Sequence, residues 1–148
     1  MAGYSGTPLP QKLGIKEGHA VALVGAPAKL ALGDVPAKVT RKLGAGPYDV
    51  ILVFVTARAE LAARIADARA RLTEAGGLWI AWPKKASGVA TDMTEQTIRD
   101  VALPTGLVDN KVCAIDETWS GLRLVIRREL RASPPKTPRR ASARSGGR

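Results

Sequence analysis

The sequence contains one cysteine and one histidine, and aromatic residues make up only 4% of it. A single cysteine, Cys113, cannot form a disulfide within the chain, so nothing here indicates export to an oxidising compartment. No group of His, Cys, Asp and Glu has the spacing of metal ligands, and we predict that no metal is bound. We expect Cys113 to be an unreactive strand residue and His19 to be structural, because no partner base is placed beside it.

Long apolar runs are also missing. No segment approaches the roughly 20 apolar residues that a membrane-spanning helix requires. Residues 1–8 have neither the basic start nor the apolar run of a secretory signal peptide. We therefore expect a cytoplasmic protein without a membrane partner.

The motifs of the common catalytic classes are absent as well. The chain has no nucleophilic serine motif and no Gly-Lys-Ser/Thr loop for a nucleotide phosphate. We predict no catalytic residue and no bound cofactor, and the sequence favours a protein that is not an enzyme.

Positive charge is plentiful but unevenly distributed. The net charge of +10 comes from 23 basic and 13 acidic residues. Residues 131–148 carry no acid and six basic residues: Arg131, Lys136, Arg139, Arg140, Arg144 and Arg148. Because this segment has no aromatic or branched aliphatic side chain, we predict a disordered basic tail. Residues 1–130 keep 17 basic and 13 acidic residues, a net charge of only +4.

The remaining sequence predicts a single small domain over residues 9–130, preceded by a coil over residues 1–8. Apolar runs predict strands at 19–24, 39–43, 49–55, 78–82, 108–116 and 122–128. Helices are predicted at 9–14, after Thr56 and over 92–103. Strands that alternate with helices pair in parallel, so we predict an α/β fold with a small Rossmann-like three-layer sheet. This sheet should be mostly parallel and close with a C-terminal antiparallel hairpin.

Local signals mark the ends of the two longer helices. Gly76 and Gly77 predict the end of the helix that begins at Thr56. Asp92 and Glu95 have the spacing of a capping box, so Asp92 is the predicted N-cap of the next helix.

The order of these elements resembles the C-terminal half of the class I S-adenosylmethionine methyltransferase fold. The resemblance covers roughly residues 18–130, and Gly-Gly-Leu-Trp-Ile at 76–80 and Gly-Leu-Arg-Leu-Val-Ile-Arg-Arg at 121–128 carry it. More closely, the chain resembles a family of small bacterial proteins catalogued only as a domain of unknown function. Four segments carry this second resemblance: residues 3–9, 12–15, 82–88 and 112–122. It implies a fold and no established activity.

The methyltransferase resemblance implies a glycine-rich cofactor turn after the first strand and an acid at the end of the second. This sequence instead has Val-Gly-Ala-Pro-Ala at 24–28, where the proline lacks an N–H group, and Arg-Lys-Leu at 41–43. The sequence therefore predicts shared geometry without shared activity.

A cationic loop follows the strand predicted at 78–82. In open parallel sheets, ligands bind outside the carboxyl ends of the strands. Lys84, Lys85, Ser87 and the backbone around Gly88 offer two ammonium groups, a hydroxyl and N–H groups, which suit phosphate, a nucleotide or a carboxylate. The alternative is a solvated loop whose lysines only keep this edge of the sheet in water.

Two tryptophans and two acids are further ligand-binding candidates at this edge. Trp82 and Trp119 are predicted to wall the pocket, and Asp116 and Glu117 lie in the hairpin turn. The two acids could bind a cationic or hydroxylated group, pair with the lysines of the loop, or serve only the turn.

The N-terminal coil supplies the last candidates. Tyr4, Ser5 and Thr7 could fold over the same edge and donate hydroxyl groups to the ligand, or they could belong to a frayed terminus.

The leading hypothesis is a non-catalytic module that binds a small anionic ligand or a protein partner at the carboxyl edge of the strands. One alternative is a nucleic-acid-binding accessory protein that uses the basic tail for phosphate contacts. Another is a divergent methyltransferase-like enzyme in which Asp116 or Glu117 acts as the base. The oligomeric state stays open.

Overall fold

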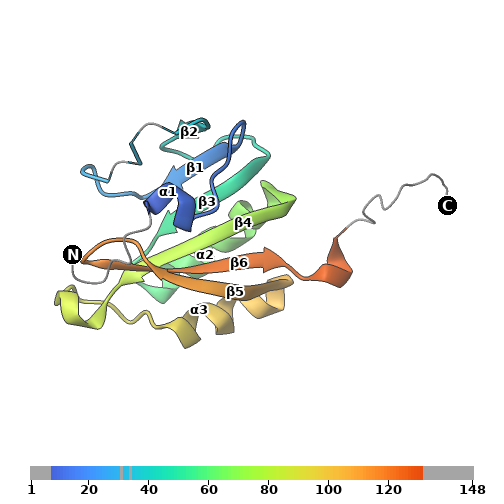
Figure 1. Ribbon diagram of the computed structural model, residues 1–148. Helices are drawn as coiled ribbons and strands as arrows, with labels where there is room; N and C mark the ends of the chain where they lie inside the picture. The colour runs from blue at the N-terminus through green and yellow to red at the C-terminus, as the bar shows by residue number, and fades with distance from the viewer. Residues whose placement is uncertain (1–7, 31, 34, 132–148) are drawn as a thin grey trace, which may run out of the picture.

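The computed structural model describes residues 8–30, 32–33 and 35–131, so most of the predicted coil and the tail from residue 132 lie outside it. The strands are β1 (Ala20–Val24), β2 (Lys38–Thr40), β3 (Tyr48–Phe54), β4 (Leu72–Pro83), β5 (Leu107–Ala114) and β6 (Trp119–Ile126). The helices are α1 (Leu9–Lys12), α2 (Arg58–Ala70) and α3 (Glu95–Ala102) (Figure 1). Three short 3-10 turns are η1 (Lys85–Ser87), η2 (Leu103–Thr105) and η3 (Arg128–Leu130).

The six strands form one sheet in the order β2-β1-β3-β4-β6-β5. The first four in this order pair in parallel, and β6 runs antiparallel to both of its neighbours. β3 is buried almost throughout because its unbroken apolar run suits a strand covered on both faces. The predicted Rossmann-like sheet with a closing hairpin is therefore confirmed.

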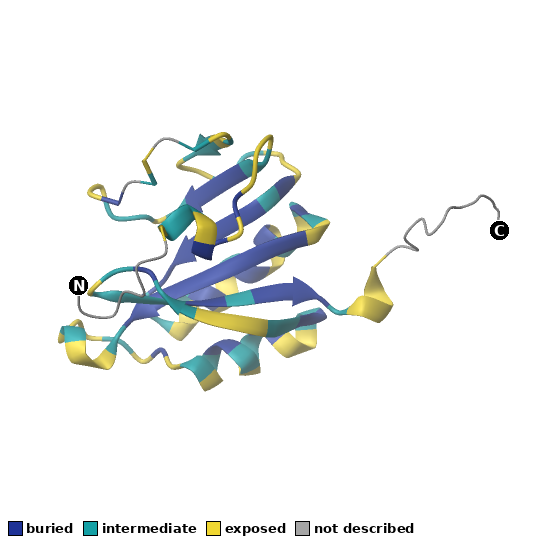
Figure 2. Cartoon of the chain, in the orientation of Figure 1, coloured by how far each residue is buried: buried dark blue, intermediate teal, exposed yellow. Residues whose placement is uncertain are grey.

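Helices α2 and α3 cover one face of the sheet. Because side chains alternate along a strand, Ile51 of β3 and Ile80 of β4 both point to this face. They pack in one buried cluster with Leu61 and Ile65 of α2 and Ile98 of α3. Figure 2 shows burial along most of β3 and β4 and an exposed middle stretch in β5, one of the two outer strands.

The opposite face, which we call the open face, is covered by a much thinner layer. Residues 9–19, here named the strap, cross it as α1 and an irregular segment (Figure 1). The buried residues of this layer include Leu13, Val50 and Trp79. The indole Nε1 of Trp79 donates a hydrogen bond of 3.0 Å to the Leu13 carbonyl, which holds the strap against β4.

The β3–β4 pairing contains a large bulge. Tyr48 pairs with Leu72, whereas Val50 pairs with Gly77, so residues 73–76 leave the regular ladder. Gly76 and Gly77 thus lie within β4, and the prediction that they end the preceding helix is wrong. α2 ends at Ala70 because the next carbonyl, that of Arg71, already accepts a hydrogen bond of 2.7 Å from the Tyr48 N–H.

The predicted helix caps are also corrected. α3 begins two residues later than predicted, and its N-cap is Thr94, whose hydroxyl accepts a hydrogen bond from the Thr97 N–H. Asp92 instead accepts a hydrogen bond of 2.8 Å from the backbone N–H of Arg58, the first residue of α2. Asp92 therefore caps α2 across space.

In the part of the chain that the structure describes, no helix has the length and apolar character needed to cross a bilayer.

Candidate functional site

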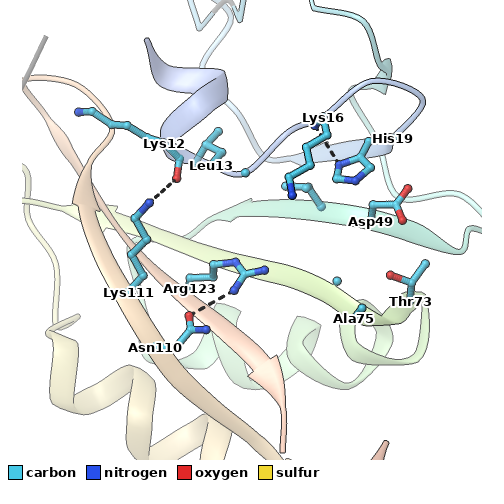
Figure 3. A pocket seen from close by; sticks show the side chains of 13 residues that line it. Lys12, Leu13, Lys16, His19, Asp49, Thr73, Ala75, Asn110, Lys111 and Arg123 are labelled. Carbon is cyan, nitrogen blue, oxygen red and sulfur yellow. Dashed lines mark hydrogen bonds between the residues drawn. The ribbon is translucent and has the colours of Figure 1, made fainter. Parts of the chain in front are cut away.

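A cavity of about 460 Å³ opens on the open face, near the amino ends of the parallel strands (Figure 3). The strap forms one side, the first residues of β3 and the β4 bulge form another, and β5 and β6 form the third. The lining residues are Lys12, Leu13, Gly14, Lys16, His19, Asp49, Val50, Thr73, Ala75, Gly76, Asn110, Lys111 and Arg123. Four of them are Lys or Arg and only one is acidic, so we call this the cationic cavity.

Lys16 and Arg123 extend from opposite sides toward the middle of the cationic cavity (Figure 3). Lys16 comes from the strap and Arg123 from β6. Within the described residues, no carboxylate lies at ion-pair distance from either side chain, because both ion pairs found there belong to Arg99. Among the described residues, the centre of the cavity is therefore positively charged, with no carboxylate paired to either cation.

The Arg123 guanidinium occupies the space beside β4 that a side chain at Gly77 would fill. A Cβ at Gly77 would collide with the guanidinium, and the Arg123 Cζ would stand only 2.9 Å from it. The Nη1 group donates a long hydrogen bond of 3.4 Å to Oδ1 of Asn110. Burial lowers the pKa of Arg123, and the positive charge of Arg131 lowers it further. This guanidinium has thus lost solvent without forming an ion pair to any described carboxylate.

Lys111 is anchored to the strap. Its Nζ donates a hydrogen bond of 3.2 Å to the Lys12 carbonyl, while Nζ of Lys12 donates to the Ala114 carbonyl at 3.0 Å. The Lys12 side chain extends away from the cationic cavity (Figure 3). Lys111 therefore contributes charge at the rim, and Lys12 contributes mainly its backbone.

His19 and Asp49 occupy the end of the cationic cavity near β1. The backbone N–H of Lys16 donates a hydrogen bond of 3.1 Å to Nδ1 of His19, which leaves Nε2 to carry the ring hydrogen. Asp49 Oδ2 accepts a hydrogen bond of 2.9 Å from the Ala20 N–H. The single carboxylate of the lining is thus engaged in holding β1 beside β3.

The loop that the sequence favours as an anion site makes its own turn. Ser87 Oγ donates a hydrogen bond of 2.6 Å to the Lys84 carbonyl and accepts one from the Val89 N–H. Gly88 has φ of +79°, a left-handed conformation that a glycine adopts readily. Lys85 is exposed and Lys84 is half-buried.

A second cavity, of about 380 Å³, lies at the carboxyl edge. It is lined by Leu9, Lys29, Leu30, Ile115, Asp116, Glu117 and Thr118. Oδ1 of Asp116 accepts hydrogen bonds of 2.8 Å from the N–H groups of Thr118 and Trp119, so this carboxylate stabilises the hairpin turn. The Lys84 N–H donates to the Thr118 carbonyl at 2.7 Å, which brings the cationic loop next to this turn. Neither cavity is lined by Lys84, Lys85, Ser87 or Gly88.

The structure does not bring the two predicted pocket walls together. Trp82 packs in the cluster on the helix-covered face, whereas Trp119 packs on the open face. The Trp119 ring meets Phe54 edge-to-face with centroids 5.0 Å apart. Both indoles therefore contribute to packing, on opposite sides of the sheet.

Several predicted site residues lie outside the described part of the chain. These are Tyr4, Ser5 and Thr7 at the N-terminus and Lys136, Arg139, Arg140, Arg144 and Arg148 at the C-terminus. Arg131 is described, and its Nε donates a hydrogen bond of 2.9 Å to the Ile126 carbonyl.

The ends of β1 and β2 are joined by an arginine. The Arg41 guanidinium donates hydrogen bonds of 2.7 Å to the Pro27 carbonyl and 3.1 Å to the Leu30 carbonyl. Arg64 reaches the same place, since a Cβ at Gly25 would lie 3.3 Å from its Nη1. The carboxyl edge of β1 and β2 is thus positively charged, and the Arg41 side chain lies across the loop that follows β1.

The described residues give little support for metal binding or for a reactive thiol. Among them, no group of three or more His, Cys, Asp and Glu is placed to hold a metal ion. Cys113 is half-buried in β5, and burial raises the pKa of its thiol although Lys12 and Lys111 oppose this effect.

Sequence reasoning missed three cations of the cationic cavity, Lys16, Lys111 and Arg123. Lys111 and Arg123 are cross-strand partners in the β5–β6 hairpin, whereas Lys16 is far from both in the chain and is brought to them by the strap. One signal was available, because Arg123 interrupts a buried apolar run of β6 and faces Trp79 of β4.

A family model described as protein of unknown function (DUF3052) matches residues 45–128, more than half of the chain. The match confirms the expected resemblance to a family of unknown function. No curated protein sequence gives a significant match.

Solved structures, several of them methyltransferases, share the fold. An S-adenosylmethionine-dependent methyltransferase from Aquifex aeolicus is 15% identical, covers 78% of this chain and 86% of its own, and has a TM-score of 0.60. The fibrillarin pre-rRNA processing protein of Methanococcus jannaschii is 13% identical, with coverages of 82% and 69% and a TM-score of 0.55. A ribosomal protein L11 methylase from Lactobacillus delbrueckii subsp. bulgaricus is 14% identical, with coverages of 81% and 76% and a TM-score of 0.52. At these identities the likeness concerns the fold alone.

Proposed function

The chain belongs to the family described as protein of unknown function (DUF3052), and from that premise we propose that it is a non-catalytic module that binds a small anionic ligand. The proposed site is the cationic cavity, with Lys16 and Arg123 as the main ligand-binding residues and Lys111 as a further donor. The methyltransferase fold by itself implies no activity, so the proposal rests on the chemistry of this cavity.

The observation that carries the proposal is that Lys16 and Arg123 extend toward each other and that no described carboxylate lies at ion-pair distance from either. A partly desolvated cation without a counter-charge is unfavourable, and a bound anion would supply both charge and hydrogen-bond acceptors. The volume of about 460 Å³ lies within the range of small-molecule sites. A phosphorylated or carboxylated metabolite would match these properties.

The residues at the carboxyl ends of β1 and β2 support the proposal that the protein is not a methyltransferase-like enzyme. Arg41 donates to two carbonyls of the loop after β1, in the region where the methyltransferase resemblance implies a cofactor turn and an acid. A cation in place of the acid disfavours a ligand held through its ribose hydroxyls. The divergent-enzyme alternative would need a different mode of cofactor binding.

Isothermal titration of the full chain with pyrophosphate and with citrate tests the proposal. We expect Arg123→Gln and Lys16→Gln each to weaken binding by about tenfold or more, because a charge-assisted hydrogen bond contributes about 1.5–3 kcal/mol. The matched control is Lys84→Gln with Lys85→Gln, which removes cations from the loop at the opposite edge and should leave affinity unchanged.

The same titration has outcomes that would reject the proposal. Loss of binding in the Lys84/Lys85 variant, with Arg123→Gln unaffected, would move the anion site to the carboxyl edge. Tight binding of S-adenosylmethionine that is insensitive to Arg123→Gln would favour the enzyme alternative instead.

A further inference from the structure

The cationic cavity has a polar end that the binding of a bare anion does not use. This end is formed by His19, Asp49 and Thr73, and we call these three residues the polar end. They lie at the right of Figure 3, whereas Lys111 lies at the left. Asp49 is the single acid among the described lining residues. The two ends of the cavity therefore differ in charge and in the hydrogen bonds that they can make.

Backbone hydrogen bonds place the polar end beside Lys16. The Lys16 N–H donates to Nδ1 of His19 at 3.1 Å. The N–H of the next residue, Ala20, donates to Oδ2 of Asp49 at 2.9 Å. The His19 ring and the Asp49 carboxylate are thus fixed next to the strap, and the polar end is continuous with the cationic centre of the cavity.

The β4 bulge brings the Thr73 hydroxyl to the same place. A Cβ at Gly76 would lie 2.7 Å from Oγ1 of Thr73 and 2.8 Å from the carbonyl oxygen of Asp49. The lack of a side chain at Gly76 therefore leaves room for both oxygens. The Thr73 hydroxyl lies beside the backbone of the residue that carries the carboxylate.

The side chains of the polar end keep hydrogen-bonding capacity that the described residues do not use. His19 accepts at Nδ1, so its Nε2 carries a hydrogen and can donate. Oδ2 of Asp49 has its partner at Ala20, and no described group donates to Oδ1 or bonds to the Thr73 hydroxyl. One donor, one carboxylate oxygen and one hydroxyl are thus available. A ligand hydroxyl suits this set because it both donates and accepts, whereas an ammonium group could not accept from His19.

We propose that the ligand of the cationic cavity is a sugar or polyol phosphate, with its phosphate at Lys16 and Arg123 and its hydroxyls at the polar end. This inference rests on the proposed anion-binding function and specifies the ligand class. The cavity of about 460 Å³ is roughly fifteen times the ~30 Å³ share of one liquid water molecule, so a phosphate group fills only part of it. A carboxylate repels a compact polyanion but accepts a hydrogen bond from a hydroxyl, so Asp49 favours the hydroxylated ligand.

Titration calorimetry of the full chain with two ring phosphates tests the proposal. Glucose 6-phosphate and cyclohexylmethyl phosphate have the same ring size and the same charge, but only the first carries ring hydroxyls. We expect glucose 6-phosphate to bind at least about tenfold more tightly, because a hydrogen bond to a charged carboxylate contributes enough for this difference. Pyrophosphate serves as the reference anion.

Asp49→Asn should change the two affinities in opposite directions. Asparagine keeps an oxygen for the Ala20 N–H but removes the negative charge. Glucose 6-phosphate affinity should fall by about tenfold, while pyrophosphate affinity should rise by about twofold or more, because the described lining loses its one acid. Thr73→Val, which keeps the shape of the side chain, should lower the ratio of the two affinities by about threefold.

Asp67→Asn is the matched control, since this exposed acid lies on α2, which covers the other face of the sheet. It should leave both affinities within about twofold of wild type. Circular dichroism and thermal unfolding establish that each variant is folded, and Thr73→Val gives an independent test if Asp49→Asn is unstable.

Equal affinities for the two ring phosphates would overturn the proposal, as would an Asp49→Asn variant or, where that variant is unstable, a Thr73→Val variant that binds glucose 6-phosphate like wild type. The small-anion site survives either result if Arg123→Gln still weakens pyrophosphate binding. An Arg123→Gln variant that binds pyrophosphate like wild type would instead reject the small-anion site and this inference with it.

Discussion

At the scale of single residues, Gly77 decides where the charge of Arg123 lies. The register places Arg123 opposite Trp79, and its guanidinium covers the backbone two residues earlier in β4. No positive φ is involved at Gly77, so the position needs glycine for space rather than for backbone freedom.

We therefore predict that Gly77→Ala weakens ligand binding strongly and lowers the stability of the fold only slightly. The new methyl group pushes aside the flexible end of Arg123, so stability should fall by less than about 1 kcal/mol. Pyrophosphate affinity should fall by about tenfold, because the guanidinium leaves the centre of the cavity. Urea unfolding and titration calorimetry on the same preparation measure the two effects.

Gly121→Ala is the matched control for this experiment. A Cβ at Gly121 would lie 2.9 Å from Cδ1 of Ile115 and 3.0 Å from Cε3 of Trp79, which are buried core atoms. Stability should then fall by about 1–3 kcal/mol while the folded protein keeps its affinity. The reverse pattern in the two variants would contradict our account of both glycines.

Glu60 gives a pH-dependent contribution at the same scale. Its Oε1 accepts a hydrogen bond of 2.8 Å from the Thr56 N–H, and this bond lowers the pKa of Glu60 below its ordinary value of 4.5. A lowered pKa means that the carboxylate stabilises the fold above about pH 4.5, and that this contribution is lost as the pH falls through the folded-state pKa. We predict that Glu60→Gln costs about 0.3–1 kcal/mol at pH 7 and clearly less near pH 3, because the lowered pKa makes this contribution fall as the carboxylate is protonated. Urea unfolding at both pH values checks this, and a difference of the same size in acid would contradict it.

At the scale of elements, side-chain oxygens accept hydrogen bonds from backbone N–H groups in the first turn of each of the two longer helices, α2 and α3. The sequence pattern located both helices, but it assigned Asp92 to the wrong one. Asp92 lies three residues before Glu95, as in a capping box, yet its carboxylate reaches the first N–H of α2. Spacing along the chain cannot distinguish a cap for the next helix from a cap for an earlier helix across space.

A substitution at Thr94 tests this assignment. Thr94→Ala should destabilise the protein by about 1 kcal/mol, because the Thr97 N–H loses its acceptor, and Thr94→Ser should restore most of the loss. Thermal and urea unfolding of the three proteins measure the difference. If Thr94→Ala left the stability unchanged, our assignment of Thr94 as the N-cap of α3 would be wrong, and Asp92 would again be the candidate.

At the scale of the whole molecule, the sheet was predictable and the site was not. An unbroken apolar run such as residues 49–55 predicts a buried strand from its composition alone. The alternation of strands with helices then predicts that neighbouring strands are parallel. The cationic cavity depends instead on the path of the strap, which no periodic pattern describes. Its position is set by contacts such as the Trp79–Leu13 hydrogen bond, between residues 66 positions apart.

The loop at 84–88 shows what composition alone leaves open. Its composition suits an anion, and its place after a parallel strand is where ligands often bind. In the folded chain, the Ser87 hydroxyl and the Gly88 conformation serve the turn itself. Composition shows which groups are available, whereas tertiary contacts decide which of them remain free.

The β4 bulge gives this fold a place where it can change in evolution. Residues 73–76 lie outside the ladder, while Leu72 and Gly77 on either side keep their partners in β3. An insertion or deletion inside the bulge therefore does not reverse the inward and outward alternation of the strand. Because Thr73, Ala75 and Gly76 also line the cationic cavity, such a change alters the size and shape of that cavity while the sheet is kept.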